Sequence, residues 1–413
     1  MHGQHNGLSR FVIVLTMISL SLAASSALAQ FYDRDGLGVR SAAMGGAGIA
    51  AAQNGEAIHY NPALLGLSED WTITLAGETR SEDVSGSEYP YRNPGSGGRF
   101  ALHQASLVVP VNHALSFGVL AGRTMHPVLN EDDWEGGMMM YSFSVGVQPH
   151  EHFCLGAAFN IWTGSYFRES SGSPDDQMVS SVDYMFQDTE VTYSRNDLTF
   201  GMAVPLTIPQ TSHQLTFAGM FRPGINLESK GGVVYSAFGA NDYLEYDRST
   251  PLGTAYGLGI KWRGWDRLTV AADGEWRYDH SINRVYAHPA PDGTANLQGM
   301  RDRYESDTSR QFRVGAEYLI PWDVAVINLR GGYRYHELPI SSDDDPNVVA
   351  NVFTGGLGVD FDHFSINAAY ENEQYEQSYH YWDYWMQQSV DGSREFTFTT
   401  FWLGMTVAIS DFF

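Results

Sequence analysis

The sequence predicts an all-β protein, a transmembrane barrel of fourteen antiparallel strands. Fourteen segments alternate apolar residues with small or polar residues, and about ten residues with this alternation are typical of a strand that has lipid on one side. The connections between these segments are alternately long and short, as in outer-membrane barrels. After the apolar N-terminal segment, no uncharged apolar stretch of about 18 residues follows, so no transmembrane helix is predicted.

Composition excludes several other classes of protein. The chain has 413 residues, with 24 Lys plus Arg against 48 Asp plus Glu, and a formal charge of −24. This charge disfavours nucleic-acid binding, because Lys and Arg must neutralise the phosphates. Hydrophobic residues make up 43% of the chain, which is too many for a disordered protein. The single cysteine, Cys154, excludes an internal disulfide and a Cys-rich zinc site.

The first element along the chain, residues 1–29, is predicted to be a secretory signal peptide. Arg10 precedes an apolar run that begins at Phe11, and the small residues Ala27 and Ala29 fit a cleavage site before Gln30. An uncleaved membrane anchor is the alternative, but the apolar run is short for a membrane span. We therefore expect an exported protein that resides in the cell outer membrane, with both termini on the periplasmic side.

The strand pattern begins at Trp71, where Trp71, Ile73 and Leu75 alternate with Thr72 and Thr74. The same alternation recurs to the end of the chain. The further predicted strands lie near 101–110, 115–119, 139–147, 152–163, 190–204, 214–222, 251–262, 267–277, 310–320, 324–336, 350–361, 363–373 and 396–413.

The connections between predicted strands differ in length according to the end of the barrel at which they lie. The long ones are 81–100, 124–137, 164–189, 223–250, 278–309, 337–349 and 374–395. The short ones are Val111–His113, Gln148–Glu151, Leu206–His213, Arg263–Asp266, Pro321–Asp323 and Asp362. Outer-membrane barrels have short periplasmic turns and longer external loops, and this alternation fits them.

A soluble β-sandwich or propeller would show the same period of two. The face that holds Asp273, Glu275 and Arg277 favours a barrel, because a dry core buries such charges only at a high cost. A wet lumen accommodates them. The last strand ends on the aromatic Phe413, which resembles the signal read by the barrel-assembly machinery, and we expect that machinery as a partner.

Residues 36–67 carry a resemblance to a known family. The stretch GVRSAAMGGAGIAAAQNGEAIHYNPALLGL is similar to the N-terminal signature of the FadL/TodX-type outer-membrane transporters for long-chain fatty acids and other hydrophobic molecules. The resemblance implies a monomeric barrel of fourteen strands, residues 71–413, with an N-terminal hatch, residues 30–70, inside its lumen. PorV-like barrels, which serve protein secretion, share this signature.

Two parts of the hatch are expected to matter for gating. Glycines at 45, 46 and 48 permit close backbone approach or a positive φ, and the dipeptide Asn61–Pro62 fixes a turn. The candidate hatch and gating residues are Met44, Gly45, Gly46, Ala47, Asn61, Pro62 and Ala63. A hatch that only fills the lumen, without moving, remains an equal alternative.

No enzymatic function is predicted. The sequence lacks Gly-x-Ser-x-Gly, His-Glu-x-x-His, a phosphate-binding GxxxxGK[ST] loop and a dinucleotide-binding unit, so no catalytic residue and no cofactor are assigned. Acidic runs such as Asp343–Asp345 could bind calcium, but none has EF-hand spacing and solvated loop tips are the simpler interpretation. No metal site is predicted.

The function that these features favour is passive transport of a long-chain fatty acid or another hydrophobic small molecule across the outer membrane, gated by the hatch. Its partners would be the hydrophobic ligand and outer-membrane lipid. Arg313, Arg330 and Arg334, on adjoining strands, are candidates to contact a ligand carboxylate. Their alternative role, which we favour, is pairing with the lumen acids Glu275, Glu317 and Glu371.

Two other functions remain open. A PorV-like barrel would act in protein secretion by receiving cargo, and large acidic loops fit that role. A general diffusion porin would conduct steadily, and a hatch in the lumen argues against it.

Overall fold

The computed structural model describes residues 32–33, 37–86, 100–126, 134–168, 185–237, 240–285, 288–289, 295–296, 301–338, 348–383 and 388–409. The predicted signal peptide and the terminal Phe413 lie outside the described residues. So does the acidic run Asp343–Asp345.

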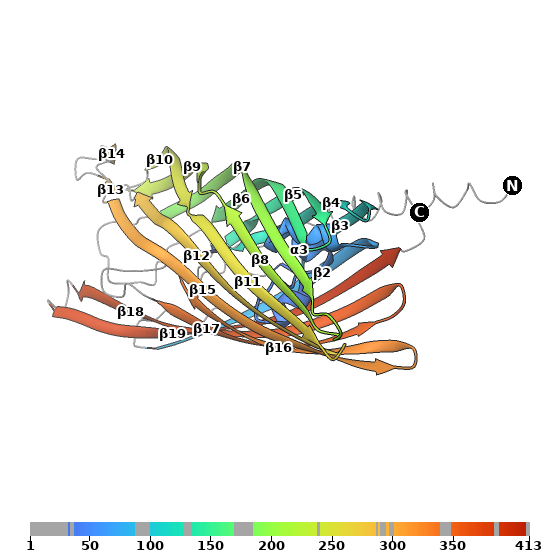
Figure 1. Ribbon diagram of the computed structural model, residues 1–413. Helices are drawn as coiled ribbons and strands as arrows, with labels where there is room; N and C mark the ends of the chain where they lie inside the picture. Colours follow the sequence, from blue (N-terminus) through green and yellow to red (C-terminus); the bar gives the residue numbers. More distant parts are fainter. Residues whose placement is uncertain are drawn as a thin grey trace.

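Fourteen antiparallel strands form a closed ring, which confirms the predicted fold (Figure 1). The ring closes between the last strand and the first, with Ile409 opposite Trp71 and Arg394 opposite Gly86. In ring order the strands are β2 (Trp71–Gly86), β3 (Ala101–Asn112), β4 (Leu115–His126), β5 (Trp134–His150), β6 (Phe153–Arg168), β7 (Met185–Thr207), β8 (Gln214–Arg222), β11 (Thr254–Gly264), β12 (Leu268–Val285), β15 (Arg301–Trp322), β16 (Ala325–Glu337), β17 (Val349–Asp360), β18 (Phe364–Asp383) and β19 (Gln388–Ile409).

At the end with the long connections, the strands are longer than the sequence predicts. The connection 223–250 holds a paired hairpin, β9 (Ile225–Ala237) and β10 (Ala240–Leu252), which continues β8 and β11 and also pairs with β7. Similarly, β12 and β15 remain paired as far as Val285 and Arg301. Backbone pairing continues there without a sustained alternation of apolar and polar side chains, so the period of two does not reveal it. The remaining short strands are β1 (Tyr32–Asp33), β13 (His288–Pro289) and β14 (Ala295–Asn296).

The two faces of the wall differ as predicted. Large apolar side chains such as Phe117, Leu258 and Phe401 are exposed on the outside of the ring. The polar residues Asp273 and Glu275 are buried on the lumen side. Within the described residues, no helix is long and apolar enough to cross a membrane.

The ring encloses three short helical segments, drawn in blue in Figure 1. They are α2 (Val39–Ala43), α3 (Asn54–Tyr60) and the 3-10 helix η1 (Pro62–Leu67). Residues 37–70 of the predicted hatch (30–70) contain all three and lead directly into β2, and the name hatch refers to these described residues below. The main apolar cluster of the described chain joins hatch to wall: Leu37, Ile49, Ile58 and Leu65 of the hatch are buried in one cluster with Val108, Leu120, Met140 and Trp162 of the strands. The hatch therefore forms the core of the barrel.

Candidate functional site

The MGGA corner, Met44–Ala47, lies against the wall made by β15, β16 and β17. Gly45 and Gly46 have φ angles of 69° and 80°, a region that side chains disfavour. The Gly45 amide donates to Thr354 Oγ1 at 2.9 Å, and the same hydroxyl donates to the Ala43 carbonyl at 3.0 Å. One wall threonine thus holds both sides of the chain reversal.

Glycines in the wall allow the corner to approach so closely. Gly315 on β15 and Gly332 on β16 are opposite each other in the ladder. A side chain at either position would overlap the main chain of the MGGA corner, at Met44 for Gly315 and at Met44 and Gly45 for Gly332. Backbone therefore packs on backbone here, and any substitution of these glycines displaces the hatch.

The NPA turn, Asn61–Ala63, is held by the Asn61 side chain. Asn61 is fully buried and extended, with φ −161° and ψ 99°, as the following proline requires. Its Oδ1 accepts from the Ala63 amide at 3.1 Å. Its Nδ2 donates to the Ile49 carbonyl at 2.9 Å and to the Met202 carbonyl of β7 at 3.1 Å. One amide joins the turn, the rest of the hatch and the wall.

A second row of glycines lies beneath the NPA turn. Gly146 on β5 pairs with Gly156 on β6, which pairs with Gly201 on β7. A side chain on any of them would overlap the hatch: the η1 backbone at Gly146, the Pro62–Ala63 main chain at Gly156 and the Asn61 side chain at Gly201. The two halves of the signature motif thus dock on glycine rows of two different walls.

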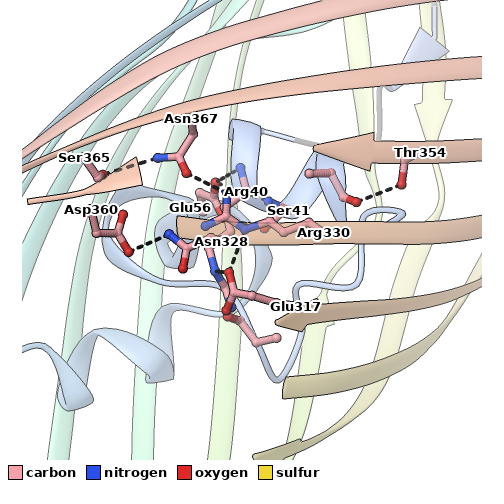
Figure 2. Close-up of polar contacts among 12 residues, drawn as sticks. Arg40, Ser41, Glu56, Glu317, Asn328, Arg330, Thr354, Asp360, Ser365 and Asn367 are labelled. Carbon is pink, nitrogen blue, oxygen red and sulfur yellow. Dashed lines mark hydrogen bonds and ion pairs between the residues drawn. The ribbon is translucent and has the colours of Figure 1, made fainter. Parts of the chain in front are cut away.

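Arg40 of α2 forms the principal charged contact between hatch and wall (Figure 2). Its guanidinium donates to both oxygens of Glu317 on β15, at 3.0 and 2.8 Å, and to the Ala51 carbonyl at 2.7 Å. Arg330 of β16 donates to the same carboxylate at 2.6 Å and to Asn367 at 2.6 Å. Burial lowers the pKa of Arg40, but its pairing with Glu317 outweighs burial and leaves that pKa raised. Arg40 therefore stays charged.

Glu56 of α3 bonds to the start of α2. The Ser41 hydroxyl donates to Glu56 Oε2 at 2.5 Å, and the Arg40 amide donates to Oε1 at 3.1 Å. Burial raises the pKa of Glu56, and the Ser41 bond and the Arg40 charge only partly oppose this. The hatch thus holds a carboxyl group that takes up a proton more readily than an exposed glutamate does.

The three predicted arginines all lie in the lumen wall and are all paired with the predicted acids. Arg313 contacts Glu275 at 2.7 Å, and Arg334 contacts Glu371 at 3.1 Å. Arg330 contacts Glu317, as described above. This arrangement is the alternative role that the sequence favours.

An aromatic cluster faces the lumen beyond the hatch, on the side of the long connections. Tyr375 of β18 stacks with Phe396 and Phe398 of β19, with ring centroids 4.7 and 5.8 Å apart. The Arg80 guanidinium lies 4.0 Å from the centre of the Phe398 ring. Leu338, Val348 and Ala350 complete the cluster. Its side chains are at most 7% exposed, so the cluster is packed apolar material with a cation at its edge.

A cavity of about 930 Å³ lies on the other side of the hatch, toward the short turns. Hatch residues including Arg40 and Glu56 form its roof, and residues near the strand ends, such as Gln148, Thr207 and His363, line its sides. Its lining mixes apolar side chains with charged ones, among them Lys261, Glu317 and Arg330. The hatch thus separates a buried aromatic cluster from a chamber that holds charged groups, which we call the polar chamber.

Sequence reasoning missed several of these residues. Arg40 lies within the signature, but its partner Glu317 is 277 positions away, so only the fold brings them together. Asp273, whose carboxylate accepts from the Ile49 amide at 2.7 Å, was predicted to face the lumen but not to contact the hatch. The wall glycines carried a usable signal, since they occupy positions of the alternation that are predicted to face inward. Within the described residues, no group of three or more His, Cys, Asp or Glu is arranged to hold a metal ion.

Solved structures share this fold. A Pseudomonas aeruginosa FadL homologue is 16% identical, with 89% of this chain and 97% of that chain aligned at a TM-score of 0.63. The Pseudomonas putida toluene transporter TodX is 15% identical over 92% and 99% of the two chains, with a TM-score of 0.62. The CymD monoaromatic hydrocarbon channel is 16% identical over 92% and 99%, with a TM-score of 0.59.

These neighbours match the family that residues 36–67 resemble, so the resemblance is confirmed at the level of the fold. No protein-family model matches the chain, and no curated protein matches its sequence.

Proposed function

We propose that this protein is an outer-membrane channel for small hydrophobic molecules, including long-chain fatty acids, and that displacement of the hatch opens it. The observation that carries the proposal is the docking of a hatch on wall glycines between a buried aromatic cluster and the polar chamber. A general porin needs neither a plug nor an aromatic cluster in its lumen. No step requires an energy source.

The aromatic cluster supports a hydrophobic ligand in particular. Burial of an alkyl chain contributes about 0.8 kcal/mol per methylene. Because the stacked rings of Tyr375, Phe396 and Phe398 are themselves buried, a ligand would gain this contact by displacing their neighbours. Arg80 at the edge of the cluster would attract an acidic head group, although Glu373 at 3.6 Å competes for that charge. The binding surface then lies above the hatch, and the ligand passes when the hatch shifts.

The test is equilibrium binding of radiolabelled oleate to the purified full-length protein. We expect Phe398→Ala, which removes a lumen-facing ring, to weaken oleate binding about tenfold, because about 1.4 kcal/mol of apolar contact is lost. Phe401→Ala is the matched control, since Phe401 lies three residues along the same strand but faces outward. Absence of saturable oleate binding to the unsubstituted protein would exclude the proposal and favour a secretion role.

The proposed channel also has an expected oligomeric state and route of insertion. A single closed ring needs no second copy to complete its lumen, so we expect a monomer that the barrel-assembly machinery inserts through the C-terminal strand. Sedimentation in detergent should give the mass of one chain. Removal of Phe413 should reduce the amount of protein that migrates in the folded, heat-modifiable form.

A further inference from the structure

Two cations in the polar chamber stand apart from the other charges of the lumen. Lys261 and Arg263 lie two residues apart on β11, so both point to the same face of the wall, and both line the cavity on the short-turn side of the hatch. Among the residues that the structure describes, neither side chain has a hydrogen bond or an ion pair.

The other lumen-facing arginines described above have carboxylate partners. Those with a direct ion pair to a glutamate are Arg40, Arg80, Arg277, Arg313, Arg330 and Arg334. The charges nearest to Lys261 are two cations, Arg40 and Arg263, and one carboxylate, Glu317. That carboxylate is already shared by Arg40 and Arg330. Lys261 and Arg263 thus form a local excess of positive charge in a protein whose formal charge is −24.

The wall around these two cations offers hydrogen-bonding groups, and the one acid near Lys261, Glu317, is already bound by Arg40 and Arg330. In the ladders, Lys261 is opposite Thr216 and Ala271, while Arg263 is opposite Gln214 and Thr269. The threonines and the glutamine all line the cavity. Among the acids of the same cavity, Glu56 and Asp360 accept hydrogen bonds elsewhere.

Glu69 and Asp70 precede β2, which is seven strands from β11 in the fourteen-stranded ring and so forms the opposite wall. An anion that enters the chamber therefore meets two uncompensated cations on one side only.

We propose that Lys261 and Arg263 form a binding site for a carboxylate in the chamber between the hatch and the short turns. A planar guanidinium and an ammonium, with hydroxyl and amide donors beside them, are suited to the two oxygens of a carboxylate. The site itself follows from the geometry of the chamber. Only its role in transport, which is to bind the acidic head group of a ligand that has passed the hatch, rests on the proposed function.

The carboxylate has two possible sources, a hydrophobic acid that has passed the hatch or a small acid from the aqueous side. Equilibrium binding to the full-length protein in nanodiscs, corrected for empty nanodiscs, separates them with three probes: radiolabelled decanoate, decanol and acetate. We expect decanoate to bind about tenfold more tightly than decanol, because only decanoate carries the charge. Acetate with an affinity equal to that of decanoate would identify a small free acid as the source.

The doubly substituted protein Lys261→Gln/Arg263→Gln should lose the preference for decanoate over decanol and bind acetate at least tenfold more weakly, with decanol binding unchanged. Arg267→Gln is the control, because it removes the same kind of charge from an exposed turn outside the cavity. Heat-modifiable migration confirms that each variant is folded.

Equal binding of decanoate and decanol to the unsubstituted protein, without acetate binding, would overturn the carboxylate site and leave the proposed channel intact. A decanoate preference that survives the double substitution would overturn it as well. Failure of decanol and decanoate alike to bind would instead remove the proposed function.

Discussion

The MGGA corner and the NPA turn belong to one hatch, but they contact walls that are about half the ring apart, and they do so by different means. Both dock on glycine rows. The NPA turn is then fixed by three bonds from one neutral side chain, Asn61, to backbone. The segment that leads into the MGGA corner is fixed by Arg40, which bonds to a charged carboxylate that has a second partner.

The difference indicates which end of the hatch can move. Loss of a buried amide leaves backbone groups without partners, so release of the NPA turn has a high free-energy cost. Glu317 keeps Arg330 if Arg40 leaves, and Arg40 itself regains water in the polar chamber, so release of that end costs less. We therefore expect the NPA turn to anchor the hatch and the α2 end to open, and the following experiments rank the two contacts.

The largest effect is expected for Gly156→Ala. The new methyl group would overlap the main chain at Pro62 and Ala63, so the free energy of hatch docking should fall by more than about 3 kcal/mol. Planar-bilayer conductance should then rise from near zero to steady current. Gly219→Ala, where a methyl group meets only ordinary contacts, is the control. Equal conductance for both variants would contradict the docking role of the glycine row.

Asn61→Ala should come next, with a loss of about 3 kcal/mol. The Ile49 and Met202 carbonyls and the Ala63 amide would lose their partner within a buried region. Hydrogen exchange of the η1 amides should accelerate by about a hundredfold. Exchange that accelerates only around the MGGA corner would show that the anchor has been placed at the wrong end.

Arg40→Met should have a smaller effect, about 2 kcal/mol. Glu317 keeps its bond from Arg330 at 2.6 Å, so the carboxylate is not left alone. Exchange should accelerate about thirtyfold for the amides of Gly45 and Ile49 and remain slow in η1. Arg310→Met, which removes a cation that is 54% exposed, is the matched control and should change neither. Uniform acceleration across the hatch would mean that both ends release together.

The smallest effect is a pH dependence that comes from Glu56. Burial raises the pKa of this carboxyl group in the docked hatch above its ordinary value of 4.5, so docking favours the protonated form. The contribution is fully present below pH 4.5 and is lost as the pH rises through the raised pKa. Hydrogen exchange at α2 and α3, corrected for the intrinsic rate, should therefore be faster at pH 8 than at pH 4.5. Glu56→Gln should abolish that difference.

Much of the fold follows from the sequence because a membrane constrains both faces of each strand. Alternation such as that at Trp71–Leu75 and at the lumen residues Asp273 and Glu275 predicts which face of each strand points inward, and its recurrence in fourteen segments predicts the strand number. The β9–β10 hairpin could not be predicted in this way, because pairing outside the apolar band imposes no hydrophobic period.

The site was predictable only in part, because its contacts depend on register between distant strands. The signature motif locates the MGGA corner and the NPA turn. It does not indicate that Gly146, Gly156 and Gly201 align across three strands, since a shift of one residue would separate them. The pairing of Arg313, Arg330 and Arg334 could be predicted from the sequence because lumen-facing acids lie on the neighbouring strands. That Lys261 has no acidic partner among the described residues could not be predicted, because it depends on the three-dimensional arrangement of the strands.

The glycine rows give the barrel wall a shape that is complementary to the hatch backbone. A hatch transplanted from another barrel of this fold would fit only if the recipient carried glycine at the same heights on the same strands. The hatch and the wall strands that receive it are consequently one steric unit, and a change of shape in either requires a matching change in the other.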